Sequence, residues 1–113
     1  MKIFVETYNL IEGMHHWSEA KGEVEYLSNP HRHLFEIRCR FEVSHNDREI
    51  EINTAQNDIE RYLKERFSRG GGICLFGGRS CEDIAEEIMT HFGEQCVQCT
   101  VLEDGYGGAT LSR

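Results

Sequence analysis

The chain has 113 residues, of which 39% are hydrophobic and 10% aromatic, and its formal charge is -8 at pH 7. This length suits one domain with a single core, and the composition is that of a globular protein rather than a disordered one. The negative charge disfavours nucleic acid, and no stretch approaches the roughly 20 apolar residues of a membrane span. We therefore expect one domain over residues 1–113 that binds neither nucleic acid nor a membrane.

Five cysteines at irregular spacing indicate reduced thiols rather than a disulfide framework. The N-terminal segment MKIFVETYNL lacks the apolar core of a signal peptide, so we expect a soluble, cytoplasmic protein. Cys96 and Cys99 form a CxxC within the strand-like sequence CVQCTVL. Residues three apart on a strand should point to opposite faces, which is a poor geometry for sharing a metal.

The N-terminal half of the chain predicts strands. Residues 2–12 alternate well enough for a first strand, and a long connection follows at 13–30. The sequence HRHLFEIRCRFEV, which starts at His31, alternates between two faces, with both of its histidines on the apolar face. A turn is predicted at 44–47, after which residues 48–52 can pair back as a third strand or extend the sheet.

The C-terminal half predicts two helices and two strands. The first helix is expected to begin with Asn53 or Thr54 as its cap, and Ser80 is expected to cap a second helix that ends at Gly93. One strand follows at 96–102 and a short one closes the chain. This order predicts an α+β fold in which an antiparallel sheet has two helices on one face. The predicted buried faces of the helices are Ile59, Tyr62, Leu63 and Phe67, and Ile84, Ala85, Ile88, Met89 and Phe92.

Three histidines are the leading candidates for metal binding. His31 and His33 lie two apart on one predicted strand, so their imidazoles project from the same face. His15 can complete the set from the first hairpin, and three imidazoles leave a fourth position for water or substrate, as in catalytic zinc sites. His16 competes with His15 for this role. The remaining interpretation is a metal-free scaffold in which these histidines are incidental.

Glu103 ends an apolar strand just before a glycine-rich turn. A carboxylate there can face a pocket and accept two N–H donors, although an ordinary charge at a strand end is the alternative interpretation. The segment GGGICLFGGRS has glycines spaced as in a phosphate loop, but Gly78 stands where the lysine is required and Arg79 where the hydroxyl residue is required. We therefore exclude a P-loop nucleotide triphosphatase.

Taken together, these residues resemble the family of 6-pyruvoyl-tetrahydropterin and 6-carboxy-tetrahydropterin synthases over nearly the whole chain. The sequence HHW at residues 15–17 is similar to the family's first-hairpin histidine and its surroundings. The sequence HRH at residues 31–33 is similar to the HGH element that opens the family's second strand. The resemblance implies that His15, His31 and His33 bind Zn²⁺.

The resemblance extends to the ligand pocket. The sequence SCED at residues 80–83 stands in the place of the family's T-x-E-N-like motif, and Glu103 in the place of its ligand-anchoring glutamate. The resemblance therefore implies that Glu103, Ser80 and Glu82 contact a pterin or purine-like heterocycle. It also implies a T-fold domain with the element order β-β-α-α-β-β, assembled into a homo-oligomer that is a trimer or a hexamer.

The chain departs from these enzymes at the groups that transfer protons. Leu27 stands where the enzymes have a cysteine, and the short segment between the predicted helices has no Asp-His pair. If the chain is active, the resemblance implies a zinc-dependent lyase, with His16, Asp83 and His91 as candidate bases and no assigned catalytic residue. The alternative is a non-catalytic protein that sequesters or senses the same heterocycle.

Overall fold

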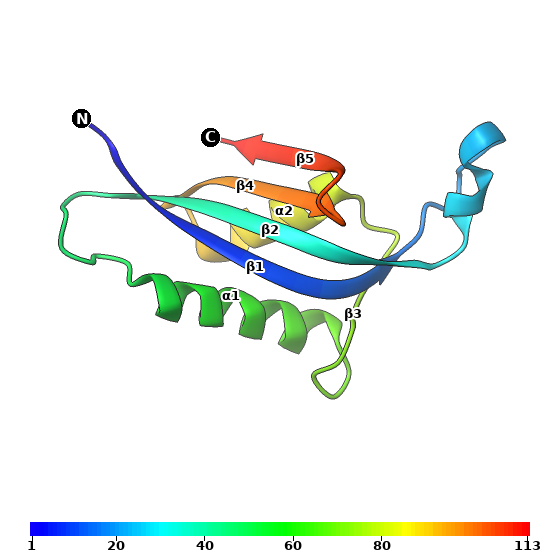
Figure 1. The fold of residues 1–113 in the computed structure, drawn as a ribbon, viewed down its shortest axis with the longest axis horizontal. Coiled ribbons are helices and arrows are strands. Elements are labelled where there is room, and N and C mark those ends of the chain that lie inside the picture. Colours follow the sequence, from blue (N-terminus) through cyan, green and yellow to red (C-terminus); the bar gives the residue numbers. More distant parts are fainter.

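The computed structural model describes residues 1–113 as one five-stranded sheet with two α-helices on one face (Figure 1). The strands are β1 (Ile3–His15), β2 (His31–Val43), β3 (Cys74–Gly77), β4 (Cys96–Glu103) and β5 (Gly107–Ser112). The helices are α1 (Ile52–Phe67), α2 (Cys81–Phe92) and a short 3-10 helix, η1 (Gly22–Ser28). The α+β class is confirmed. None of the helices has the length and apolar content needed to cross a membrane.

The sheet order is β3-β1-β2-β4-β5, and every neighbouring pair is antiparallel except β1 with β3. The sheet is therefore mixed, whereas the sequence predicted an antiparallel one. The additional strand β3 has the sequence CLFG and pairs in parallel with the end of β1. Four residues are too few to show an alternation, so the segment between the helices gave no strand signal.

β1 is longer than predicted, because it ends at His15 rather than at residue 12. β1 and β2 pair without interruption from Ile3 opposite Val43 to His15 opposite His31. The connection between them therefore covers residues 16–30, and it projects beyond the end of the sheet with η1 at its tip (Figure 1). His15 thus belongs to a strand whose position in the sheet is fixed.

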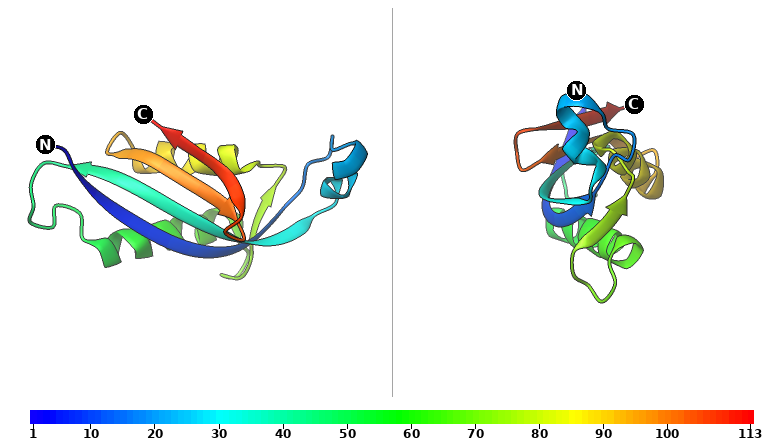
Figure 2. Two further views of the ribbon diagram at one scale, coloured as in Figure 1. Left: turned by 45° about the horizontal axis from the view of Figure 1, so that its top comes forward. Right: turned by 90° about the vertical axis from the view of Figure 1, so that its right-hand side faces the viewer.

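The core lies between the sheet and the two α-helices (Figure 2). Alternate residues of β2 point into it, so that Phe35 and Ile37 are fully buried while their neighbours face the other side. Burying such a side chain contributes about 1.5–3 kcal/mol relative to exposure, which holds both helices against the sheet. The predicted helix faces are buried at Ile59, Leu63, Phe67, Ile84, Ala85, Ile88 and Met89, while Tyr62 and Phe92 are partly buried.

Helix α1 begins at Ile52, so residues 48–51 form no third strand. The cap is neither Asn53 nor Thr54, which corrects the prediction. Instead, the Glu51 carboxylate accepts the backbone N–H of Asn53 at 2.8 Å and that of Thr54 at 2.9 Å. These hydrogen bonds lower the pKa of Glu51, and the carboxylate also complements the positive end of the helix dipole. Capping therefore overrides the strand-like alternation of REIEI.

Helix α2 begins and ends where the sequence predicted. The hydroxyl of Ser80 accepts the Asp83 N–H at 3.1 Å, and the Asp83 carboxylate accepts the Ser80 N–H at 3.1 Å. This reciprocal capping box fixes the first turn, and Gly93 ends the helix with a φ of 83°. The preceding strand β3 is tied to the end of β1 because the His16 N–H donates to the Gly77 carbonyl at 2.9 Å. The start of α2 therefore lies next to the end of β1.

Cys96 and Cys99 are both fully buried, which corrects the prediction that they point to opposite faces. The pairing of β2 with β4 is irregular between Arg40 and Phe41, so that one residue of β4 is skipped and the alternation shifts. The irregularity turns both thiols toward the core. All five cysteines are free and buried.

Gly13 on β1 leaves no room for a side chain, which makes it a test of the packing beside β3. A Cβ at this position would lie 2.5 and 2.8 Å from ring carbons of Phe76 and 3.0 Å from Phe35, and both rings are fully buried. We expect Gly13→Ala to lower the free energy of unfolding by about 1–3 kcal/mol, measured by urea denaturation. Gly72→Ala is the control, because a Cβ there meets nothing within 4 Å. Equal midpoints for the two variants would contradict this packing.

Candidate metal centre

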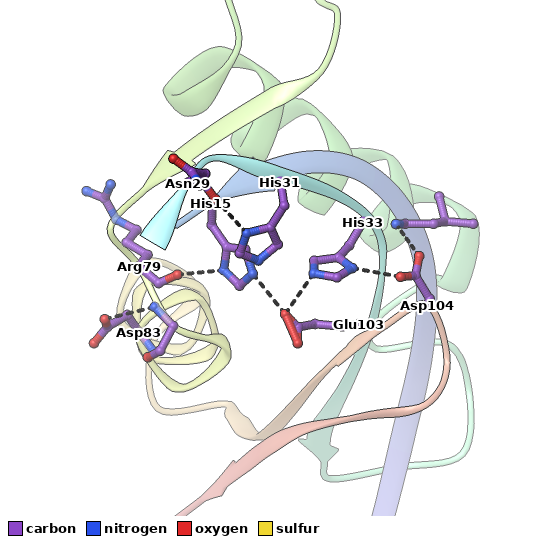
Figure 3. A network of polar contacts seen from close by, with 10 residues as sticks. His15, Asn29, His31, His33, Arg79, Asp83, Glu103 and Asp104 are labelled. Atoms are coloured by element: carbon purple, nitrogen blue, oxygen red, sulfur yellow. Dashed lines mark hydrogen bonds and ion pairs between the residues drawn. The ribbon is translucent and has the colours of Figure 1, made fainter. Parts of the chain in front are cut away.

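Three strand ends meet at one place on the buried side of the sheet. His15 ends β1, His31 and His33 lie at the start of β2, and Glu103 ends β4. Because β2 is antiparallel to both of its neighbours, its start lies beside the ends of β1 and β4. One ligand atom of each side chain lies within 4.8 Å of the others, and Figure 3 shows the four side chains converging. These four residues are called the His-Glu cluster below.

Two of the imidazoles are oriented by backbone carbonyl groups. Nδ1 of His15 lies 2.9 Å from the carbonyl oxygen of Arg79, and Nδ1 of His31 lies 2.9 Å from that of Asn29. A carbonyl oxygen can only accept, so Nδ1 must donate its proton in both contacts. In the neutral imidazole, Nε2 then carries a free lone pair, which is the form that binds a metal.

The third imidazole is oriented by a carboxylate. Nδ1 of His33 donates to Asp104 at 2.7 Å, and the other oxygen of Asp104 accepts the N–H of Leu34 at 2.8 Å. These two hydrogen bonds lower the pKa of Asp104. Asp104 has a φ of 53°, in the left-handed region that aspartate tolerates better than most residues. A carboxylate behind a histidine in this way is the usual support of a metal ligand.

Two nitrogen atoms that point into the His-Glu cluster lack a hydrogen-bond partner. Nε2 of His15 and Nε2 of His33 are buried and unpaired. An oxygen of Glu103 approaches them to 2.8 and 3.2 Å, but neither approach has hydrogen-bond geometry. An unpaired buried polar atom costs about 1–3 kcal/mol. A cation between these atoms would satisfy them together, so the donor set fits a metal ion, and the cluster can hold one.

A cavity of about 350 Å³ opens beside the His-Glu cluster. His15, His31 and Glu103 line one part of it, and Ser80 and Glu82 line another at the start of α2. The structure therefore brings all three predicted heterocycle-binding residues to one cavity, next to two of the predicted metal ligands. Its volume lies within the range of about 300–1,000 Å³ that is typical of small-molecule sites.

The backbone carbonyl group that orients His15 belongs to Arg79. Its guanidinium donates to Glu87 at 2.9 Å and to the Phe76 carbonyl at 3.1 Å, and it lies 4.8 Å from the centre of the Phe67 ring. The hydrogen bonds from Arg66 and Arg79 lower the pKa of Glu87, so this carboxylate stays charged at neutral pH. Sequence reasoning considered Arg79 as part of a phosphate loop and missed this supporting role.

Cys81 is a second residue that sequence reasoning missed. It lines the cavity, and burial together with the carboxylates of Glu103 and Glu82 raises the pKa of its thiol to about 12. At neutral pH the group is therefore a neutral thiol that holds its proton. Its place directly after a helix cap gave no functional signal, because first-turn residues are mostly structural.

The structure separates the three candidate bases. His16 lines the cavity, next to the cluster but outside it. The Asp83 carboxylate is used in the cap of α2, and His91 stacks on Tyr62 with ring centres 3.8 Å apart, away from the cavity lining. Leu27, in the position where the resembling enzymes have a cysteine, also lines the cavity.

No protein-family model matches the chain, and no curated protein matches it.

The Asp104 carboxylate is expected to control the metal affinity of His33. In Asp104→Asn the amide has one carbonyl oxygen, so it cannot accept from both His33 and Leu34, while asparagine still tolerates the backbone conformation. We expect the affinity for a divalent metal to fall by about 10–100-fold, measured by competition with a chelator. Asp58→Asn, at an exposed ion pair with Arg61, should leave it unchanged. Wild-type affinity in Asp104→Asn would show that this support is not needed.

Proposed function

We propose that this chain is a zinc-binding protein of the tetrahydropterin-synthase type, whose cavity takes a pterin or purine-like heterocycle. His15, His31 and His33 would hold the ion. The observation that carries the proposal is the pair of buried Nε2 atoms, of His15 and His33, that lack a hydrogen-bond partner within the His-Glu cluster. The order β1-β2-β4-β5 within the sheet, with α1 and α2 on one face, supports a T-fold-like arrangement.

Zinc suits these ligands best. Three neutral imidazoles with one position left for another group are the ligand set of many catalytic zinc sites, and the cluster has no thiolate that would favour a softer metal. The hydrogen bonds at Nδ1 fix each tautomer before any ion arrives, so little reorganisation is needed. Bound zinc would supply a Lewis acid that polarises a carbonyl or hydroxyl oxygen of the ligand's side chain.

The lining of the cavity suits a flat heterocycle with N–H donors. Trp17 and Leu27 provide apolar contact area, while Glu103 and Glu82 provide carboxylates that accept hydrogen bonds. A pterin or purine presents an amide and an amino group on one edge, which match a carboxylate with two N–H groups. The carboxylates also disfavour a phosphate placed against this wall, because like charges repel.

In the catalytic interpretation, the chain would be a zinc-dependent lyase acting on a dihydropterin triphosphate. One residue of the cavity, His16, is available to move protons as a base. It would have to replace the cysteine and the Asp-His pair that the resembling enzymes use.

A second candidate is a protein that binds the heterocycle without converting it. One observation favours this candidate: the side chain at the enzymes' cysteine position is Leu27, and it lines the cavity as an inert apolar group. The high pKa of the Cys81 thiol also makes it a poor nucleophile. The two candidates share the metal and the ligand and differ in turnover.

Zinc content tests the proposal first. Untagged wild-type protein should contain close to one zinc per chain by elemental analysis, and the His31→Ala/His33→Ala double variant should contain background amounts. His45→Ala, in the exposed loop after β2, is the control, and His16→Ala should also keep zinc because the structure places His15 in the cluster. Background zinc in folded wild-type protein would contradict the proposal.

Ligand binding tests the second half of the proposal and separates the two candidates. Trp17 is the single tryptophan and lines the cavity, so its fluorescence should change when pterin or guanine binds. Glu82→Gln should weaken that binding by about tenfold or more, since a charged hydrogen-bond acceptor is lost. Conversion of a dihydropterin triphosphate would favour the lyase, and saturable binding without conversion would favour the binding protein. No binding of either heterocycle would contradict both.

A further inference from the structure

We propose that Glu103 is the fourth ligand of the metal in the protein without a heterocycle, and that a bound heterocycle draws this carboxylate away and opens the fourth position. The inference rests on the proposed metal site and adds its regulation. Glu103 would then have two roles that it cannot perform at the same time. It coordinates the metal while the cavity is empty, and it binds the heterocycle once that ligand enters.

Two distances within the His-Glu cluster are close to those of a four-coordinate site, and all four ligand atoms lie within 4.8 Å of one another. In a tetrahedral complex with bonds of about 2.0–2.1 Å, neighbouring ligand atoms lie about 3.3 Å apart. Oε2 of Glu103 lies 3.2 Å from Nε2 of His33 and 2.8 Å from Nε2 of His15. When His15 and His33 are neutral, these approaches bring a negative charge toward nitrogen lone pairs, and an ion between the atoms would compensate that repulsion. The same oxygen is well placed to share one ion with both nitrogens (Figure 3).

The four ligands differ in how firmly they are held. His15, His31 and His33 are each fixed through Nδ1 by a group on another segment or turn. The Glu103 carboxylate has no such hydrogen bond, and its side chain is 33% exposed against 10% for His15. The carboxylate is therefore the ligand that can leave the ion at the lowest cost.

Recognition of a heterocycle competes with coordination. Accepting two parallel N–H groups uses both carboxylate oxygens, including the one that faces the imidazoles. Glu103 lines the cavity as well as the cluster, so a ligand in the cavity can reach it without moving the strands. When Glu103 pairs with the ligand, the fourth coordination position of the metal becomes free. This position faces the cavity, which His15 and His31 also line. The metal is thus closed to small molecules until the cavity is filled.

The test uses cobalt-loaded protein, because the visible absorption of Co²⁺ changes when a new ligand enters. Imidazole is the probe, since a neutral ligand is not repelled by the carboxylate charge. We expect imidazole to bind Glu103→Gln about tenfold more tightly than wild type. Glu12→Gln is the matched control, because Glu12 is exposed, pairs with Arg32 and lies outside the cluster. It should behave as wild type.

Adding pterin to cobalt-loaded wild type should raise its imidazole affinity toward that of Glu103→Gln. Equal imidazole affinity in wild type and Glu103→Gln would overturn the coordination by Glu103 while leaving a three-histidine metal site standing. An imidazole affinity that pterin does not change, while the fluorescence of Trp17 shows that pterin is bound, would overturn the opening of the site, and this arm needs no variant to fold. Absence of pterin binding would instead contradict the proposed ligand. Failure of wild type to bind Co²⁺ at all would overturn the metal site itself, which is a different result.

Discussion

The antiparallel register of β1 and β2 is the constraint on which the rest of the structure depends. It runs without interruption to the pair of His15 with His31. The same pairing therefore determines which side chains face the core and where the imidazoles lie. Because side chains alternate along a strand, a slip of one residue would turn His15 to the outer face and put Met14 in its place. The same slip would expose Ile11, the buried apolar side chain of β1. Burial of the apolar side chains therefore also fixes the positions of the histidines on the same strands, and no further interaction is needed to bring them to the candidate site.

Elements with a sustained pattern could be predicted from the sequence. β2 alternates over its whole length because one face is buried, and α2 carries both an apolar stripe and a capping box. The spacing of His31 and His33 on such a strand also indicated that they share a face. The T-fold and the heterocycle ligand do not follow from such patterns. They come from the resemblance to a family, and both stay proposals. Within the site, the convergence of the three histidines is a consequence of strand pairing that the sequence pattern could suggest.

The features that the sequence did not reveal depend on contacts between distant segments. Asp104 supports His33 from 71 positions away, and the Arg79 carbonyl supports His15 from 64 positions away. No periodicity records such pairs, so both residues looked like ordinary turn and loop positions. β3 is a strand because the end of β1 offers a free edge, and Glu51 caps α1 against the local alternation. In each case a tertiary contact or a cap outweighs the local preference.

The order in which the ligands occur along the chain has a consequence for assembly during synthesis. The hairpin of β1 and β2 lies within residues 1–43, so local pairing can bring the three histidines together while the helices and β4 are still being made. The carboxylates of Glu103 and Asp104 arrive last, with the final third of the domain. A nascent chain would thus present imidazoles without Glu103 and Asp104, and these negative groups would arrive with β4, the strand that completes the core.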